Sequence, residues 1–596
     1  MNTARSLLTL GLSATCLGTA FAGSPSVALH VRLTAPGAAI ELSWDASASR
    51  MVLESADRLG GAWSLLDLEG VASATGAMVS VTDPRPVVGS RFYRLRETSV
   101  VPTTGSPAYD IGNPVWTDVF VDPVNGRDGD ENYDGTTRAR AFQTLSVAWR
   151  SMPEGVQARA TRFRLLPGTY VGAYLEDRQG TAAFPILIEP AEGPGTVVFR
   201  PTPAGDSGSL QFFNCAYAYV QDFRISVEGG DALHWERCDH VLARRMQVNS
   251  RRSEGQDETV KVNQSHHVYL EDSEISDAGD NCIDVVGAQH GHIVRCRIAN
   301  ANDWGAYLKG GSAYWLVEGN EIVGCGTGGF TAGQGSGFQF MSPPWIHYEA
   351  YDIKVVNNLI RDCEGAGLGV NGGYNILMAY NTLYRIGARS HTVEFVHGRR
   401  GCDGGDVAGC QPLVDAGGWG TTGEELQYIP NRNVQFVNNL VYNPPGSRSQ
   451  YQHFQFSSAV TPPSGSNVQD PARSDEGLVI RGNVIFDGPA DWPLGNEEEG
   501  SGCRGAGCNP EQLRAENAIN AEEPVLVNPA AGDFRPVNGG WLAQQRTTPA
   551  ADFTWADAPS RPAVPEGTLG NQVPRAFGGG LRPAGSAPGA FLVAAP

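Results

Sequence analysis

Short apolar runs separated by polar turn residues fill most of this chain, and one phrase of this pattern recurs. The phrase consists of an apolar stretch, then Asn, then two residues of which the second is apolar. It appears as VEGNEI, VVNNLI, MAYNTL, FVNNLV and IRGNVI. Looser upstream copies are QDFRI, RRMQV, EDSEI and VRCRI. We take the last apolar residue of each copy as its anchor. The first seven anchors are Ile225, Val248, Ile275, Ile298, Ile322, Ile360 and Leu383. Successive anchors are 23, 27, 23, 24, 38 and 23 residues apart. A period of this size with occasional insertions predicts a solenoid of stacked coils.

Each coil is expected to consist of strands and turns, because its apolar runs are short, β-branched and bounded by Gly, Asn and Asp. The recurring Asn has a physical explanation. It tolerates the left-handed conformation of a turn, and stacked copies can hydrogen-bond from coil to coil.

Composition narrows the class of protein. The 596 residues include 74 Gly and 38 Pro but only 18% charged residues, which favours turn-rich β-structure. The net charge is −20, which argues against binding to nucleic acid or to an anionic membrane surface. We expect no transmembrane segment, because no apolar run after the N-terminal one is long enough to span a bilayer. We also expect a monomer.

The chain is predicted to divide into five segments. Residues 1–22 contain an apolar run and a small-residue site at Ala20-Phe21-Ala22, which indicates a secretory signal peptide and an exported protein. Residues 27–98 contain short alternating strands and are expected to form a small β-sandwich. A linker (99–116), the solenoid (117–545) and an irregular Pro-, Ala- and Gly-rich cap or tail (546–596) follow.

Two stretches carry a resemblance to known families. The segments LSW, LES and FYRLR of residues 27–98 resemble small fibronectin-like modules of secreted bacterial proteins. The opening of the solenoid from Val119, VFVDPVNGRDGDENYDGTTRARAFQTLSVAWRSMPEG, resembles that of right-handed parallel β-helix proteins of the pectate-lyase-like superfamily. The resemblance implies an all-β fold whose open end is covered by a short helix, expected here over 142–152 with Leu145, Ala148 and Trp149 on its apolar side.

Ten cysteines remain after the predicted signal peptide. Register places Cys215 beside Cys238 and Cys325 beside Cys363 on adjacent coils, which lie about 4.8 Å apart. These pairs are either coil-to-coil disulfides or stacked free thiols. Short loops could be closed by disulfides between Cys402 and Cys410 and between Cys503 and Cys508, and Cys282 with Cys296 is a less certain pair.

Register also gathers polar residues on one outer face. His234, Lys261 and Asp284 all lie fourteen residues before their anchors, and Asp257 and Asp280 both lie eighteen before theirs. Apolar residues flank this column, so strand alternation directs its side chains outward. A one-residue insertion in the next coil is expected to bring Lys309 into the same column, and Glu258 lies at its edge.

Long insertions on the following coils are expected to form the sides of a cleft beside this face. They bring Trp345 and Arg389, and Trp304 adds aromatic surface nearby. With His234, these residues are the predicted contacts to a polysaccharide.

Clustered aspartates and lysine on a β-helix face are similar to the arrangement in calcium-dependent polysaccharide lyases of this superfamily. The resemblance implies that Asp257, Asp280 and Asp284 bind Ca²⁺ and that Lys261 or Lys309 acts as the base in β-elimination of an acidic glycan. None of the longer active-site motifs of the lyase families is intact in this sequence.

Two other interpretations stay open. Lys and Asp on neighbouring coils also make ordinary cross-strand ion pairs, in which case the protein is a non-catalytic surface or matrix protein that binds carbohydrate. A glycoside hydrolase needs two carboxylates across a cleft, and Asp280 with Asp284 does not identify such a pair. Whether the protein is an enzyme is therefore left open by the sequence.

Overall fold

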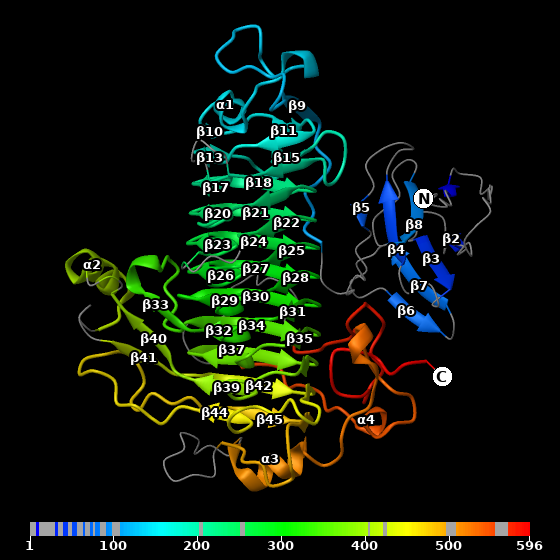
Figure 1. Ribbon diagram of the computed structural model, residues 1–596, viewed down its shortest axis with the longest axis vertical. Coiled ribbons are helices and arrows are strands. Elements are labelled where there is room, and N and C mark those ends of the chain that lie inside the picture. The colour runs from blue at the N-terminus through cyan, green and yellow to red at the C-terminus, as the bar shows by residue number, and fades with distance from the viewer. Residues whose placement is uncertain are drawn as a thin grey trace. The chain divides into compact units, whose positions relative to one another are not determined.

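The computed structural model describes residues 108–201, 207–250, 255, 257–402, 404, 406–420, 426–495, 508–554 and 570–595, together with strand segments nearer the N-terminus (Figure 1). The chain forms two compact units. One comprises Met1–Asn113 with Pro574–Pro583, and the other comprises Pro114–Val573 with Ala584–Pro596.

The first unit contains two four-stranded antiparallel sheets. One has the order β2–β3–β7–β6, with bounds His30–Leu33, Ile40–Asp45, Met78–Asp83 and Ala72–Thr75. The other has the order β1–β8–β4–β5, with bounds Leu8–Leu10, Arg91–Glu97, Met51–Ala56 and Ser64–Leu65. The rest of the predicted signal peptide, the packing of the predicted β-sandwich and most of the predicted linker lie outside the described residues.

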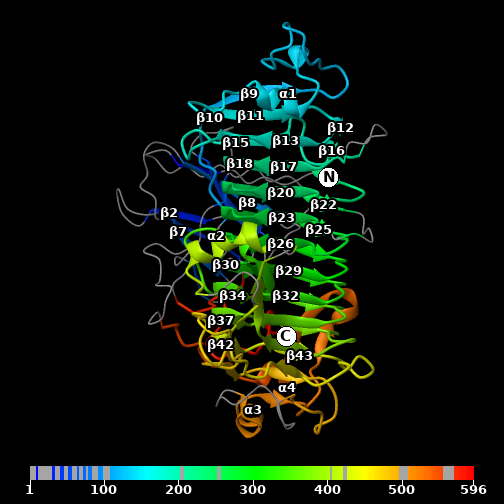
Figure 2. The ribbon, with the colours of Figure 1, turned by 90° about the vertical axis from the view of Figure 1, so that its left-hand side faces the viewer.

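The second unit is a parallel β-helix in which each coil passes through three sheets, named here sheets 1, 2 and 3 in chain order. Figure 2 shows the strands of sheet 1 stacked one above another. Its ten strands are β13 (Ala173–Glu176), β17 (Leu210–Phe213), β20 (Leu233–Glu236), β23 (Val260–Asn263), β26 (Ile283–Val286), β29 (Trp304–Lys309), β32 (Gly328–Gly333), β36 (Ala366–Asn371), β39 (Val393–Val396) and β44 (Phe454–Phe456).

Sheets 2 and 3 complete the coils. Sheet 2 consists of β9 (Trp116–Val121), β11 (Ala160–Leu165), β15 (Ile186–Pro190), β18 (Ala216–Gln221), β21 (Asp239–Arg244), β24 (His266–Glu271), β27 (Gln289–Val294), β30 (Ser312–Glu318), β34 (Ala350–Val356), β37 (Gly373–Ala379), β42 (Arg432–Val437) and β45 (Val479–Arg481), with β10 (Gly155–Val156) and β14 (Arg178–Gln179) beside them. Sheet 3 consists of β12 (Gly168–Tyr170), β16 (Val197–Phe199), β19 (Arg224–Ser226), β22 (Gln247–Asn249), β25 (Glu274–Ser276), β28 (Arg297–Ala299), β31 (Glu321–Val323), β35 (Leu359–Arg361), β38 (Thr382–Tyr384), β43 (Leu440–Tyr442), β46 (Val484–Phe486) and β47 (Ala518–Ile519).

The sequence anchors are the central residues of the sheet 3 strands, and their predicted register is confirmed. Ile225 pairs with Val248, and the pairing continues from anchor to anchor as far as Leu383. Leu383 then pairs with Val441 and Val441 with Ile485, so the downstream copies of the phrase follow the same column. The anchors from Ile225 to Leu383 are buried because one apolar core runs along the axis of the helix.

The recurring Asn forms a buried ladder, as predicted, but its own backbone is not left-handed. From Asn320 through Asn358, Asn381, Asn439 and Asn483 to Asn517, each Oδ1 accepts hydrogen bonds from the backbone N and the Nδ2 of the preceding member. The positive φ lies one residue earlier, at 56° in Asn357. The turn conformation and the ladder therefore belong to two adjacent residues.

The first end of the solenoid carries the predicted helix, shorter than expected. It is α1 (Leu145–Arg150), capped by Thr144 Oγ1, and its buried residues are Leu145, Ala148 and Trp149. After β46 the chain continues through α3 (Pro510–Glu516), β47, β48 (Leu526–Asn528), β49 (Asp533–Pro536) and α4 (Trp541–Gln544). Parts of the predicted tail pack along sheet 2, where the carbonyl oxygens of Ala551 and Gly570 accept hydrogen bonds from Gln435 and Lys354.

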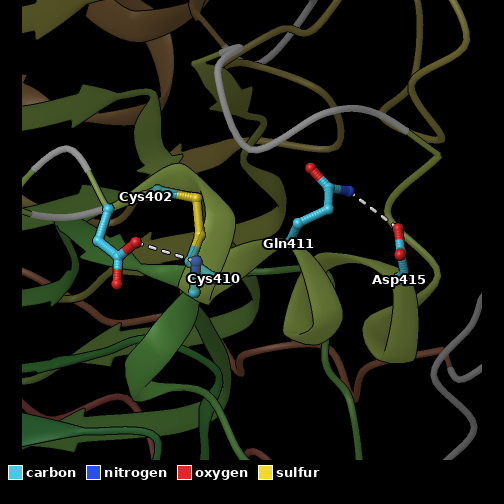
Figure 3. Close-up of a disulfide and its surroundings, with 6 residues drawn as sticks. Cys402, Cys410, Gln411 and Asp415 are labelled. Atoms are coloured by element: carbon cyan, nitrogen blue, oxygen red, sulfur yellow. Dashed lines mark hydrogen bonds between the residues drawn. A yellow bond between two sulfur atoms is a disulfide. The ribbon is translucent and has the colours of Figure 1, made fainter.

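The long insertions build a small side structure beside the coils (Figure 1). It comprises β33 (Gly335–Gly337), β40 (Gly398–Gly401) and β41 (Gln427–Ile429) in one sheet, the 3-10 helix η2 (Phe338–Phe340), and α2 (Val407–Gly417). Two short 3-10 turns, η1 (Arg138–Arg140) and η5 (Pro529–Ala531), complete the described elements. A disulfide joins Cys402 to Cys410 at the start of α2, as predicted (Figure 3).

The coil-to-coil disulfides were the wrong alternative. Cys215, Cys238, Cys325 and Cys363 are buried free thiols, and so are both members of the third proposed pair, Cys282 with Cys296. The register is nonetheless right, because Cys238 and Cys363 each have a hydrogen bond to the thiol one coil before. Cys508 is disulfide-bonded, and its predicted partner Cys503 lies outside the described residues.

Candidate functional site

The outer face of sheet 1 carries a row of polar side chains in strict register. His234 on β20 pairs with Lys261 on β23, Lys261 pairs with Asp284 on β26, and Asp284 pairs with Tyr307 on β29. Strands in a sheet lie about 4.8 Å apart, so these side chains follow one another closely along the axis.

Lys261 is held between two carboxyl groups. Its Nζ donates to Glu258 Oε1 at 2.9 Å and also to Asp284 Oδ2. Asp284 is only 1% exposed and Glu258 is buried as well. The Lys261–Asp284 ion pair therefore lies largely out of water, where a charge without a partner is costly.

The pKa values of Glu258, Asp284 and Lys261 are all shifted from their ordinary values. Burial raises the pKa of Glu258 to about 9, and the charge of Asp284 adds to the rise, so Glu258 is protonated at neutral pH. Burial opposes ionisation of Asp284, but Lys309 and Lys261 outweigh it and hold the Asp284 pKa below its ordinary value. Burial would lower the Lys261 pKa, but Asp284 and Glu258 outweigh it and raise that pKa. A charged Lys261 with two acceptors is suited to an ion pair rather than to taking up a proton.

Lys309 does not occupy the column in which it was expected. Tyr307 pairs with Asp284, and Lys309 pairs with Val286 two residues further along. The extra residue of this coil lies in the turn after Lys309, at Gly310 and Gly311, where φ is 67° and 85°. It therefore lengthens the distance to the anchor Ile322 to fifteen residues, which brings Tyr307 into the column.

Lys309 nevertheless points along the same face toward Tyr307. Its Nζ lies 3.0 Å from the Tyr307 hydroxyl oxygen and 3.0 Å from Gln334 Oε1. The same hydroxyl accepts a hydrogen bond from Asn281 Nδ2 at 3.0 Å. Burial, together with the charge of Asp284, holds the pKa of Tyr307 well above its ordinary value, so the phenol keeps its proton.

Aspartates line the corner that leads into sheet 1. Asp257, Asp280 and Asp303 lie on successive coils, and the backbone N of each later residue donates to the carbonyl oxygen of the one before, at 3.0 and 2.9 Å. Burial raises the pKa of Asp280, and the charges of Asp303 and Asp284 add to it. Ionisation of Asp280 is therefore already disfavoured by its neighbours.

This arrangement does not fit a calcium ion held by Asp257, Asp280 and Asp284. Within the described part of the chain, a single group of three His, Cys, Asp or Glu side chains brings its ligand atoms within 4.8 Å of one another, and it contains none of these residues. Asp284 is also neutralised by Lys261. Calcium is therefore assigned no role in the chemistry considered below.

The predicted sugar contacts lie in different environments. His234 is on the row, where its Nδ1 is 2.9 Å from Gln211 Oε1, and burial lowers its pKa. Trp304 is buried and packs against Tyr307, so it supports the site without presenting its ring. Trp345 is partly buried within the side structure, and Arg389 pairs with a carboxylate on a loop.

An aromatic surface on the same face had not been expected. Tyr174 on β13 is 69% exposed, and its ring lies parallel to that of Phe213 with centroids 5.8 Å apart. Phe213 in turn meets His234 edge to face at 5.6 Å. The alternation in AYLE and LQFF carries this signal. The anchor Ile225, fourteen residues after Gln211, also places LQFF in register with His234, whereas AYLE has no anchor phrase of its own.

Comparisons with known proteins agree with the fold. Residues 246–403 match the family model described as "Right handed beta helix region". No curated protein matches the chain. Among helices of the described residues, none has both the length and the apolar character needed to cross a bilayer.

Three similar solved structures illustrate how distant the likeness is. ORF18 of Geobacillus virus E2 has a TM-score of 0.30 at 12% identity, covering 48% of this chain and 61% of its own. A rhamnogalacturonan lyase has a TM-score of 0.36 at 13% identity, covering 62% and 87%. The A-module of the Azotobacter vinelandii mannuronan C-5 epimerase AlgE6 has a TM-score of 0.32 at 13% identity, covering 55% and 86%.

A likeness of this extent carries no argument about activity. The family match and the parallel pairing of three stacked sheets together show that the body of this chain is a right-handed parallel β-helix.

Proposed function

We propose that this protein is exported and acts on an acidic polysaccharide, which lies along the outer face of sheet 1 and is cleaved there by β-elimination. The observation that carries the proposal is the Lys309–Tyr307 pair, an amine and a phenol 3.0 Å apart on that face. The chain has 44 Lys and Arg residues together but only three lysines, Lys261, Lys309 and Lys354. Two of the three, Lys261 and Lys309, therefore lie on the outer face of sheet 1. Unlike lysine, arginine holds its proton at all pH values of interest.

β-Elimination needs a group to remove a proton and a group to donate one. In its neutral form, Lys309 Nζ would take the proton from the carbon next to the uronate carboxylate. The electron pair of that C–H bond would form the new double bond as the glycosidic C–O bond breaks. Tyr307, whose raised pKa keeps the phenol protonated, would then give its proton to the leaving oxygen.

Lys261 has a different role in this proposal. It keeps Asp284 neutralised next to Tyr307, so that a polyanion does not meet an uncompensated carboxylate. The exposed ring of Tyr174 and the partly exposed Phe213 would contact sugar units further along the chain of the glycan.

The test is the ultraviolet absorbance of an unsaturated product across a panel of uronate polysaccharides, with calcium and with chelator. Wild type should produce it on at least one substrate, and Lys309→Ala and Tyr307→Phe should each lose at least a hundredfold in rate. Lys354→Ala is the matched control, because this lysine lies on sheet 2 and donates to the Gly570 carbonyl oxygen.

A second candidate function is supported by the ion pair itself. If Lys261 and Asp284 are no more than a cross-strand pair, the row is a binding surface of a non-catalytic protein. Retained binding of a polysaccharide in affinity electrophoresis, with no unsaturated product from any member of the panel, would support this function and exclude the lyase.

Export is tested separately. Expression of the whole chain in a secreting bacterial host, followed by N-terminal sequencing, should find the mature protein beginning at Gly23. Recovery of the uncleaved chain in the cytoplasm would contradict the proposal.

A further inference from the structure

A second cluster of ligand-type side chains lies on sheet 2, away from the row on sheet 1. Asp239 begins β21, His240 follows it, and His267 is the second residue of β24 on the next coil. One oxygen and two nitrogens of these residues are the group whose ligand atoms all lie within 4.8 Å of one another.

The two imidazoles share one carboxylate oxygen. Asp239 Oδ1 lies 3.0 Å from His240 Nδ1 and 2.7 Å from His267 Nδ1. All three side chains are partly exposed, so an ion can reach them from solvent.

Backbone geometry brings the histidines together. One residue near the start of each of five successive strands of sheet 2 has a positive φ, between 50° and 64°. It is the second residue of β18, β21, β24 and β27 and the third of β30. The rings stack from coil to coil in the order Tyr217, His240, His267, His290 and Tyr314. Non-glycine residues seldom adopt this conformation. The repeated turn therefore places three imidazoles in succession along one edge.

We infer that Asp239, His240 and His267 form a binding site for a divalent transition-metal ion, with Zn²⁺ as the first choice. Two imidazole nitrogens and one carboxylate oxygen are a common protein ligand set for zinc, and they leave a fourth position for water. Ligands of a tetrahedral zinc ion lie about 3.3 Å apart, given bonds of about 2.0 to 2.1 Å. The observed nitrogen–oxygen separations of 3.0 and 2.7 Å are shorter than that value, so the ligands would move apart by roughly half an ångström or less to admit the ion.

Binding requires a small change at the rings. The planes of His240 and His267 are inclined by only 19°, with centroids 4.1 Å apart. A nitrogen lone pair lies in the plane of its ring, so the two rings must turn about their Cβ–Cγ bonds to direct both lone pairs at one ion. The ion would then replace the protons that now join each nitrogen to Asp239.

The next histidine of the stack supplies a further donor. His290 Nδ1 is buried and has no hydrogen-bond partner within the described part of the protein. By contrast, His266 Nδ1 already accepts a hydrogen bond from the backbone N of Gln289 at 3.2 Å. His290 is therefore the neighbour that could complete the shell in place of water.

The experiment is isothermal titration of ZnCl₂ into the full-length protein, produced without a polyhistidine tag and dialysed against chelator. Wild type should bind one ion per chain, and MgCl₂, an ion that prefers oxygen ligands, should give no heat. His240→Ala and His267→Ala should each weaken binding at least tenfold. Asp239→Asn, which keeps the size of the side chain, should weaken it less but measurably.

The matched control is His391→Ala, a histidine on a loop near β39 that lies outside the cluster. It should bind zinc as wild type does. Thermal unfolding without metal should show each variant folded, and added zinc should raise the melting temperature of wild type and of His391→Ala but not of His240→Ala or His267→Ala. Absence of zinc binding by wild type, or binding that is unchanged in both His240→Ala and His267→Ala, would overturn the inference. The result is independent of the proposed lyase, whose residues lie on another sheet.

Discussion

Asn358 and Asn381 lie on successive coils, and the side chain of Asn381 accepts hydrogen bonds from Asn358. Asn381 Oδ1 accepts hydrogen bonds from both the backbone N and the Nδ2 of Asn358, each at 3.0 Å. Asn381 in turn donates to Asn439 and, through Nδ2, to the Val355 carbonyl oxygen. Both residues are fully buried, so no water can replace these bonds.

Asn381→Ala is therefore expected to be strongly destabilising. It leaves the backbone N–H of Asn358 buried without a partner and removes the buried hydrogen bonds from Asn381 Nδ2 to Val355 and Asn439, at a cost of about 1 to 3 kcal/mol for each unsatisfied group. Urea unfolding should show a loss of about 3 kcal/mol or more. Asn132→Ala is the control and should cost less than about 1 kcal/mol, because the Asn132 side chain lies in an exposed turn and donates to Asp130 Oδ1. Equal losses in the two variants would contradict the ladder's structural role.

Breaking the Lys261–Asp284 pair should cost more than removing it. Lys261→Met leaves Asp284 buried without its partner and is expected to lower the free energy of unfolding by about 2 to 3 kcal/mol. The double variant Lys261→Met with Asp284→Leu should recover most of this loss, because no charge is then left uncompensated. Chemical unfolding of the two single variants and the double variant gives the coupling, and additive losses would show that the pair is not coupled.

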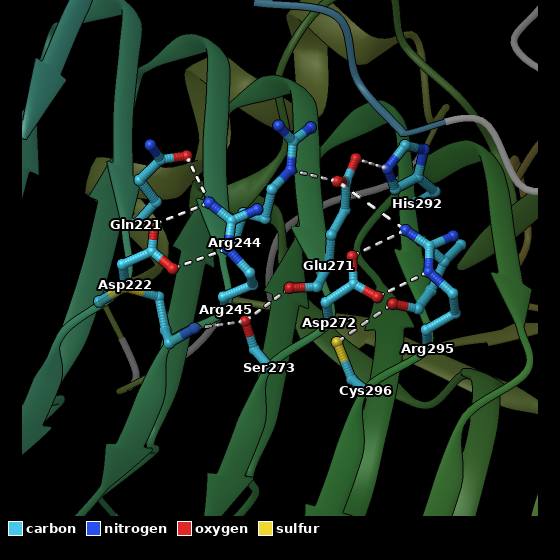
Figure 4. Close-up of polar contacts among 12 residues, drawn as sticks. Gln221, Asp222, Arg244, Arg245, Glu271, Asp272, Ser273, His292, Arg295 and Cys296 are labelled. Carbon is cyan, nitrogen blue, oxygen red and sulfur yellow. Dashed lines mark hydrogen bonds and ion pairs between the residues drawn. The ribbon is translucent and has the colours of Figure 1, made fainter. Parts of the chain in front are cut away.

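Acid should weaken the protein through Glu271, a fully buried carboxylate on sheet 2 (Figure 4). Burial opposes its ionisation, but Arg244 and His292 outweigh burial and hold the Glu271 pKa below its ordinary value of 4.5. A depressed pKa in the folded state stabilises the protein above the unfolded pKa, and this stability is lost as the pH falls below about 4.5 toward the folded pKa.

Thermal unfolding between pH 7 and pH 3 measures this dependence. Wild type should lose stability steeply at the acid end. Glu271→Gln should be less stable than wild type at pH 7 and should show a shallower fall below pH 4.5. Glu274→Gln, an exposed carboxylate on the neighbouring strand β25 of sheet 3, is the control. A parallel pH profile for Glu271→Gln and wild type would rule out this carboxylate as the source.

Tyr174 should matter for long glycans. Tyr174→Ala removes an exposed ring from the same face as Lys309 and is expected to weaken polysaccharide binding about fivefold, since an aromatic contact contributes about 1 kcal/mol. Phe184→Ala removes another exposed ring, from the turn before β15, and should leave binding unchanged. Affinity electrophoresis on the best substrate compares them, and equal effects would place the glycan elsewhere.

The sequence alone was sufficient to predict the β-helix. In a parallel β-helix each residue stacks on its counterpart one coil later, so a constant offset along the chain becomes adjacency in space. That is why the anchors, the Asn ladder, the neighbouring thiols and the His234–Lys261–Asp284 row were all predicted from spacing. The same argument failed for Lys309, because counting cannot show on which side of a strand an extra residue is accommodated.

Only the tertiary structure decided what the neighbouring groups do to one another. Adjacency did not show that Lys261 is engaged by two carboxyl groups, that Tyr307 stands between Asp284 and Lys309, or that the stacked cysteines are free thiols. The cluster of Asp239 with His240 and His267 joins residues at different strand positions on two coils, so no single offset reveals it. Backbone register follows from period and alternation, whereas burial, side-chain direction and charge pairing depend on distances of a few ångströms that only the folded chain defines.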